Sequence, residues 1–315
     1  MARIEKLRRS VRNEHELAPG VEALVAHLHG FTFTDVAAGA VEGPAQDPAP
    51  VPGVEATDVD LPGEPPVAAR RYRPVDRSST RRPGVVWVHG GAWMFGDLDQ
   101  PEADAVARRL CRDLGAVVFS VDYRLAPTHT FPTALHDVVA AFLAATEDFE
   151  VDPARVALGG ASAGGNIAAG AAQVLRDRGG PSPAAVFLAY PATDPVGGPY
   201  PSERPSVCPE LLWFEPDVTT FLFSVYLGGA VDTQYAVPAA GPLESLPPTL
   251  VTTSPIDALE DQALRYVDLL RAAGVVAEHH REAGLLHGYL SMVGSVAAAD
   301  DALARHTMWL AETLG

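Results

Sequence analysis

The chain of 315 residues is 47% hydrophobic and carries a formal net charge of −17. A chain of this length buries about three quarters of its unfolded surface, which is enough for one large core without a second globular domain. The acidic balance argues against binding of nucleic acid and against attachment to anionic membranes, because both require basic patches.

The two cysteines, Cys111 and Cys208, are too few for a disulfide framework and belong to no metal-binding spacing. The charged N-terminus is not followed by an apolar stretch long enough for a signal peptide. No segment approaches the ~18 uninterrupted apolar residues of a membrane span. We therefore expect a reduced, cytoplasmic protein. Because no GxGxxG, P-loop, HExxH or EF-hand pattern occurs, we expect no metal and no cofactor.

The order of strand-like and helical runs predicts the fold class. Residues 1–30 have helical spacing of apolar residues, and 37–66 are rich in Pro, Gly and acidic residues, so we assign 1–53 to N-terminal cap helices and a connector. Strand-like runs follow at 54–60, 67–73, 85–89, 116–121, 155–159, 184–190, 249–254 and 275–281. Helical runs alternate with them from about residue 100, which predicts an α/β fold whose mostly parallel central sheet is flanked by helices on both faces.

An aromatic-rich segment, 195–240, interrupts this alternation and is punctuated by Pro and Gly. We expect it to be a small helical cap inserted into a core made of 54–194 and 241–315. An aromatic stripe at helical spacing packs as core more often than it lines a pocket. We therefore expect only part of the segment to face a ligand, with Trp213 and Phe214 as candidates.

The first chemical motif is a glycine loop that follows a strand. Val85–Val88 runs directly into His89-Gly90-Gly91-Ala92-Trp93. Bare backbone of this kind can turn several N–H groups toward one point, and such donors stabilise the oxyanion of acyl transfer. We expect Gly90 and Gly91, together with Ala163, to supply them. The alternative is a tight loop that needs positive φ, which predicts one glycine and not two in line.

The second motif is a nucleophile elbow. Gly160-Ala161-Ser162-Ala163-Gly164 lies between the strand-like run 155–159 and a helical stretch. The glycines permit the sharp turn and the close strand-to-helix packing that raise a serine above the sheet. The alternative is an ordinary serine in a glycine-rich turn.

Such a serine requires a base and a carboxylate to orient it. Of the ten histidines, His287 follows the last strand-like run and a short loop, and Asp257 follows the strand-like run 249–254. The order serine, aspartate, histidine is the one that α/β-hydrolase sheets use. Asp257 could instead cap the next helix, and Glu260 and Asp261 are competing carboxylates.

These motifs resemble those of the hormone-sensitive-lipase-like family of α/β-hydrolase carboxylesterases over most of residues 55–315. The resemblance is carried by HGGAW at 89–93, YRLAP at 123–127, GASAGGN at 160–166, Asp257 followed by Leu259, and HGY at 287–289. The resemblance implies that Ser162 is the nucleophile, His287 the general base and acid, and Asp257 its orienting partner. It also implies the three oxyanion donors named above and a bracing role for His89. Trp93, Met94, Phe95 and Tyr289 lie near enough to these residues in sequence to be candidates for the substrate pocket.

The chain departs from the family pattern at three positions. Ala161 replaces the usual Asp beside the nucleophile, Thr128 replaces a Glu after YRLAP, and Ala92 replaces a third glycine. A methyl at 92 is acceptable if φ stays negative. We expect the other two changes to affect the rate and not the type of reaction.

The sequence therefore predicts a serine carboxylesterase that needs no cofactor and acts on a short-chain or compact ester through an acyl-enzyme. We expect a small-molecule ester as its partner and a homodimer as a possible assembly. An amidase, deacetylase or acyltransferase would use the same triad. A ligand-binding protein of this fold without catalysis is the alternative from another class, although such proteins typically lack the histidine that His287 supplies here.

Overall fold

The computed structural model describes residues 16–28, 51–76, 80–194, 205–213, 215–231 and 233–315. Parts of the expected N-terminal helices, the connector and the cap segment lie outside these residues. Phe214, a candidate pocket residue, also lies outside them.

Eight strands of the described residues form one sheet, and all eight correspond to predicted runs. They are β1 (Val54–Leu61), β2 (Val67–Pro74), β3 (Arg82–Val88), β4 (Val117–Val121), β5 (Val151–Ala161), β6 (Ala185–Ala189), β7 (Thr249–Thr253) and β8 (Ala277–Arg281). The order is β1-β2-β4-β3-β5-β6-β7-β8. The pairs β1–β2 and β2–β4 are antiparallel and the other pairs are parallel. The predicted mostly parallel sheet is confirmed.

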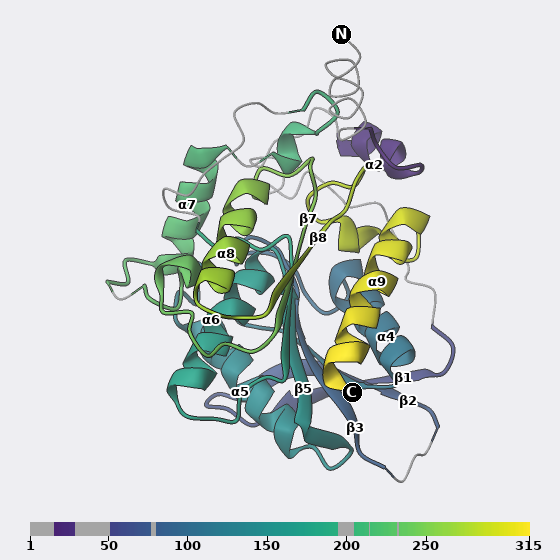
Figure 1. Ribbon diagram of the computed structural model, residues 1–315, viewed down its shortest axis with the longest axis vertical. Helices are drawn as coiled ribbons and strands as arrows, with labels where there is room; N and C mark the ends of the chain where they lie inside the picture. The colour runs from purple at the N-terminus through teal and green to yellow at the C-terminus, as the bar shows by residue number, and fades with distance from the viewer. Residues whose placement is uncertain (1–15, 29–50, 77–79, 195–204, 214, 232) are drawn as a thin grey trace.

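Helices cover both faces of this sheet (Figure 1). On one side lie α5 (Thr133–Glu147), α6 (Ala163–Asp177) and α8 (Glu260–Ala272), and on the other lie α4 (Pro101–Leu114) and α9 (Ala297–Leu314). Each face of the sheet has its own hydrophobic core. Along β3, Val86 and Val88 belong to the core that includes residues of α5, α6 and α8, whereas Val85 and Trp87 belong to the core that includes residues of α4 and α9. A parallel strand that is buried on both faces is apolar throughout, which explains the continuous hydrophobic run in the sequence.

The described residues contain further helical elements besides those that cover the sheet. They are α2 (Val21–Leu28), η1 (Glu210–Leu212), α7 (Pro216–Leu227), η2 (Pro238–Ala240) and η3 (Tyr289–Met292). Helix α7 contributes Phe223 and Tyr226 to the core, where the ring of Trp93 stacks on Tyr226 at 4.8 Å between centroids. No helix in the described part of the chain is both long and apolar enough to cross a bilayer.

Candidate active site

Ser162 occupies the turn between β5 and α6, where the backbone is strained. Its φ is +53° and its ψ is −117°, outside the regions that L-residues favour. A Cβ on Gly160 would lie 2.4 Å from the carbonyl oxygen of Gly164, and one on Gly164 would lie 2.2 Å from that of Val88. Side chains cannot enter at either position, so the two glycines are required for the elbow that raises Ser162.

The side chains of Ser162, His287 and Asp257 form one hydrogen-bonded line. Ser162 Oγ lies 2.9 Å from His287 Nε2, and His287 Nδ1 lies 2.8 Å from Asp257 Oδ2. Asp257 is 1% exposed and His287 is 6% exposed. With the carboxylate accepting from Nδ1–H, the lone pair of Nε2 is directed at the serine hydroxyl. The arrangement can remove a proton from Ser162 and return it.

Backbone contacts hold the two loops that carry Asp257 and His287 in register. Ile256 and Leu286, which directly precede the two residues, form an isolated parallel bridge. The hydroxyl of Ser254 donates to the carbonyl of Leu285. These contacts extend the pairing of β7 with β8 beyond the sheet, so acid and imidazole are positioned by one small unit.

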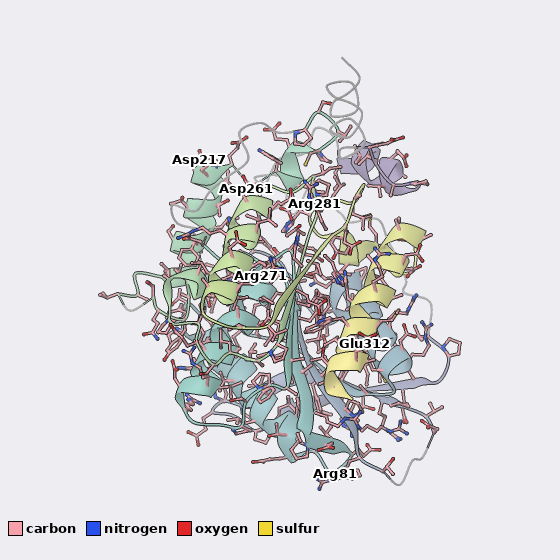
Figure 2. All side chains as sticks on the ribbon, in the orientation of Figure 1. Arg81, Asp217, Asp261, Arg271, Arg281 and Glu312 are labelled. Atoms are coloured by element: carbon pink, nitrogen blue, oxygen red, sulfur yellow. The ribbon has the colours of Figure 1, made fainter. Side chains whose placement is uncertain are left out.

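Hydrogen bonds distinguish Asp257 from the competing carboxylates and from a role as a helix cap. Glu260 accepts two hydrogen bonds from Arg281, at 2.7 and 2.9 Å, and it is therefore engaged with β8. Figure 2 shows Arg281 on this strand and Asp261 at the start of α8. Asp257 does not cap α8, whose N-cap is Leu259, but its Oδ1 accepts the amide of Leu259 at 2.8 Å. This bond orients the carboxylate toward His287.

The glycine loop after β3 has backbone angles that favour glycine. Gly91 has a φ of +128°, and a Cβ on it would lie 2.0 Å from the carbonyl oxygen of Phe95. Ala92 has a φ of +51°, so the condition under which a methyl is accepted without strain, a negative φ, is not met. Its methyl is held in the left-handed region, which costs on the order of 1 kcal/mol and accounts for the glycine that the family pattern has there.

The hydrogen-bond partner of the first amide of this loop, that of Gly90, also differs from expectation. The N–H of Gly90 donates to Oε2 of Glu102 at 2.6 Å, so it is not available to an oxyanion. Glu102 comes from the first turn of α4, and no local pattern around Gly90 indicates the contact. Among the described residues, the N–H groups of Gly91, Ala92 and Ala163 have no acceptor. All three residues line the cavity beside Ser162 and can stabilise an oxyanion there.

Comparison with known proteins agrees with this geometry. Residues 85–291 match a family described as alpha/beta hydrolase fold. The chain belongs to this family. It is 36% identical over 275 residues to the carboxylic ester hydrolase LipN of Mycobacterium tuberculosis, covering 82% of this chain and 71% of LipN. A hyperthermophilic esterase from the archaeon Pyrobaculum calidifontis is 35% identical, with a TM-score of 0.74 over 82% of this chain and 85% of the esterase.

A more distant relative is the arylacetamide deacetylase of Bos taurus, which is 29% identical and covers 72% of this chain and 73% of the deacetylase. These relatives place the chain in the hormone-sensitive-lipase-like branch of the α/β-hydrolases, as its motifs predicted.

In this α/β-hydrolase, His89 lies behind the glycine loop and does not face Ser162. It is fully buried, its Nδ1 donates to the carbonyl of Gly90 at 2.7 Å, and its ring stacks on Tyr123 at 4.6 Å between centroids. Burial lowers the pKa of His89, which keeps the imidazole neutral. Tyr123, from the YRLAP motif, donates its hydroxyl to the carbonyl of His89 at 3.1 Å.

A cavity of about 290 Å³ opens in front of Ser162. Its lining comes from the glycine loop with Trp93 and Phe95, from the turns around Ser162 and His287, from Leu212, Thr219 and Leu222, and from single residues of other segments. The lining residues that sequence reasoning missed are Gln100, Glu102, Ala192, Leu212, Thr219, Leu222, Leu259, Gly288 and Ser291. The wall is therefore largely apolar and built from distant segments.

Of the pocket candidates, Trp93 and Phe95 line the cavity, whereas Met94, Tyr289 and Trp213 do not. Consecutive residues of a turn point in different directions, and Met94 packs against the core. Tyr289 is fully buried, and its hydroxyl lies 2.7 Å from Oγ1 of Thr252. Trp213 is buried in the core that contains α4 and α9. Nearness in sequence to the triad therefore did not predict which side chains face the cavity.

The steric demand at Gly91 leads to a testable prediction. Gly91→Ala is expected to lower kcat by roughly 100-fold or more, because its methyl displaces the amides that face the oxyanion. Gly274→Ala is the matched control, since Gly274 also has positive φ, +79°, but open space around its Cβ. Steady-state kinetics and thermal unfolding of both variants check this. Equal kcat in the two variants would show that the loop tolerates the methyl.

Proposed function

We propose that the protein is a serine carboxylesterase in which Ser162 is the nucleophile, His287 the general base and acid, and Asp257 the residue that orients it. The observation that carries the proposal is the hydrogen-bonded line of these three side chains. Ser162 and His287 border a largely apolar cavity, beside backbone N–H groups that have no acceptor among the described residues.

The reaction proceeds in two halves. Ser162 Oγ attacks the ester carbonyl carbon while His287 Nε2 takes the hydroxyl proton, and the oxyanion accepts from the amides of Gly91, Ala92 and Ala163. The bond to the alcohol oxygen breaks as Nε2 returns the proton to that oxygen, which leaves an acyl-enzyme. Water then gives a proton to Nε2 and attacks the acyl carbon. Ser162 recovers its proton as the acid leaves.

We propose a compact, neutral ester as the substrate, which a small apolar cavity supports. We also propose that the segment 195–240 acts as a cap, with the N-terminal 1–53, over the core of 54–194 and 241–315. Leu212, Thr219 and Leu222 support this because they bring the middle of the segment to the cavity wall. A cytoplasmic location is part of the proposal, and the thiols of Cys111 and Cys208, which are buried and form no disulfide, support it.

An amide substrate is the second candidate, because an arylacetamide deacetylase is among the relatives. Deacetylation of an aryl amide would use the same acyl-enzyme, with an amine in place of the alcohol as leaving group. Transfer of the acyl group to an added alcohol would reveal an acyltransferase.

The test is a panel of chromogenic esters of graded acyl length, with matched anilides and an acceptor alcohol. We expect kcat/KM to be highest for short acyl chains and to fall roughly tenfold or more once the chain exceeds the cavity, because each misfitting methylene costs about 1–3 kcal/mol. Faster turnover of the anilides would assign an amidase. Tight binding of the esters without turnover would favour the ligand-binding alternative.

A further inference from the structure

A buried acid that the proposed triad does not use contacts the glycine loop at the cavity wall. Glu102 is 6% exposed and stands in the first turn of α4, where the positive end of the helix dipole favours an anion. Its Oε2 accepts the N–H of Gly90 at 2.6 Å, and its Oε1 accepts the hydroxyl of Tyr190 at 2.5 Å. Its own carbonyl accepts the indole N–H of Trp87 at 2.8 Å. The side chain is thus fixed at both oxygens.

The hydrogen-bond pattern around Glu102 indicates that its side chain is a negatively charged carboxylate. The Tyr190 oxygen accepts the N–H of Leu290 at 3.3 Å, so its single proton is free to donate to Glu102. If Glu102 were protonated on Oε1, that proton would point at the Tyr190 oxygen and the tyrosine proton would have no acceptor among the described residues. A proton on Oε2 would oppose the N–H of Gly90. Only the carboxylate satisfies every donor.

Tyr190 connects this anion to the catalytic imidazole. Its ring meets that of His287 edge-on, with centroids 5.0 Å apart and planes at 63°. Its N–H donates to the carbonyl of Thr252 at 2.7 Å, which ties it to β7. The residue has a φ of +37°, so its backbone is held in the left-handed region. The strained turn after β6 thus places one aromatic ring between Glu102 and His287.

We infer that Glu102 is a positioning residue of the proposed esterase, with two separable effects. Through Gly90 it fixes the glycine loop so that the next two amides face the oxyanion. Its negative charge polarises Tyr190, whose ring contacts the imidazole, and thereby favours the charged His287 that forms as Ser162 loses its proton. The inference rests on the proposed function, since both effects concern acyl transfer at Ser162.

The other ionisable groups that face Glu102 do not cancel this charge. Burial raises the pKa of Tyr190 and of Tyr123 well above the usual value, so both phenols stay neutral. Burial raises the pKa of Glu102 above its ordinary value, although the hydrogen bonds from Tyr190 and Gly90 and the nearby His287 oppose this rise. The charge of Glu102 is therefore assigned from its hydrogen bonds. Asp257 binds the imidazole directly at Nδ1. His287 therefore has one buried acid, Asp257, bound to it and a second, Glu102, beyond the ring of Tyr190.

The two effects are separated by two substitutions. Glu102→Gln removes the charge and leaves one donor unsatisfied, so we expect kcat to fall by roughly 10- to 100-fold with little change in KM. We also expect the acid limb of the kcat/KM profile to move to lower pH by about half a unit or more, because protonation of His287 loses a favourable partner. Glu102→Asp keeps the charge but is too short to reach Gly90. It should lower kcat without moving the acid limb.

Asp104 gives a matched control on the same helix. It is also a buried carboxylate that accepts from a tyrosine, with Tyr72 Oη 2.8 Å from Oδ1, but it faces Arg108 and not the site. Asp104→Asn should lower the melting temperature and leave the pH profile in place. If Glu102→Gln keeps kcat within twofold and its acid limb unmoved, or if Asp104→Asn gives the same kinetic changes, the inference is overturned.

Two further measurements keep the result decisive. If Glu102→Gln does not fold, Tyr190→Phe is used, and it must move the acid limb in the same direction. The rate at which a fluorophosphonate labels Ser162 is measured over pH for every variant, because it needs the nucleophile, the imidazole and the oxyanion donors but no ester. A wild type that labels at Ser162 and turns over no ester would overturn the proposed function, while the labelling rates would still decide the role of Glu102.

Discussion

Ser162→Ala is expected to lower kcat on a short-chain ester by about 10⁶-fold, with KM little changed. Without the hydroxyl no acyl-enzyme forms, and the amides and cavity alone retain only a residual acceleration over water. The cavity wall loses one oxygen atom, so substrate binding should persist. Hydrolysis by purified wild type and variant, followed under saturating ester, checks the prediction.

A second serine provides the control for this substitution. Ser120 lies fully buried on β4, and its hydroxyl has no hydrogen-bond partner in the described structure. Ser120→Ala should therefore keep both the activity and the fold. Mass spectrometry of the protein after fluorophosphonate treatment should find the adduct on Ser162. Near-equal turnover by Ser162→Ala and wild type would rule out the serine mechanism.

The sheet was predictable because its strands are buried on both faces. Val85–Val88 and the run at 155–159 are apolar without alternation and are bounded by Gly, Pro or charged residues, which marks buried parallel strands. The observed β5 begins four residues earlier than predicted, at Val151, because Val151 pairs with Arg82 across a register shift. Such pairing depends on a distant strand, so it leaves no local signal.

The residues of the proposed triad could be selected from sequence because each follows a strand that belongs to the sheet. The orientation of the backbone amides and side chains around these residues could not be predicted from sequence. Gly90 was expected to donate to the oxyanion, but Glu102 binds its amide from a helix twelve residues away. In sequence, Glu102 reads as an ordinary acid in the first turn of a helix, where the dipole favours it. Its position directly after Pro101 marks the helix start, but only tertiary packing brings it to the loop.

The segment 195–240, which we propose as a cap, also shows that sequence does not fix which side chains face the cavity. The aromatic stripe was expected to be mainly core, and Phe223 and Tyr226 are indeed buried, whereas Phe221 is 59% exposed. The residues of α7 that reach the cavity are Thr219 and Leu222, which no composition argument would have chosen. Facing a cavity depends on how a helix is rotated against its neighbours, and the periodicity of α7 alone does not fix that rotation.

Asp257→Asn is expected to lower kcat by about 10⁴-fold while the protein stays folded. An amide at this position can present its NH₂ group to Nδ1, which favours the tautomer that carries its proton on Nε2 and cannot accept from Ser162. It also removes the charge that stabilises the imidazolium. The measurement is kcat over pH, together with the fluorophosphonate labelling rate of Ser162.

The matched control is Asp261→Asn, four residues along the chain. Asp261 lies in the first turn of α8 (Figure 2), where its charge favours the helix dipole, whereas the carboxylate bound to His287 is that of Asp257. This variant should keep its kcat and lose at most about 1 kcal/mol of stability. Because Glu260 is bound to Arg281, it is not free to replace Asp257. If Asp257→Asn and Asp261→Asn had equal activity, another group would have to orient His287, and the hydrogen bond of 2.8 Å to Asp257 would be structural only.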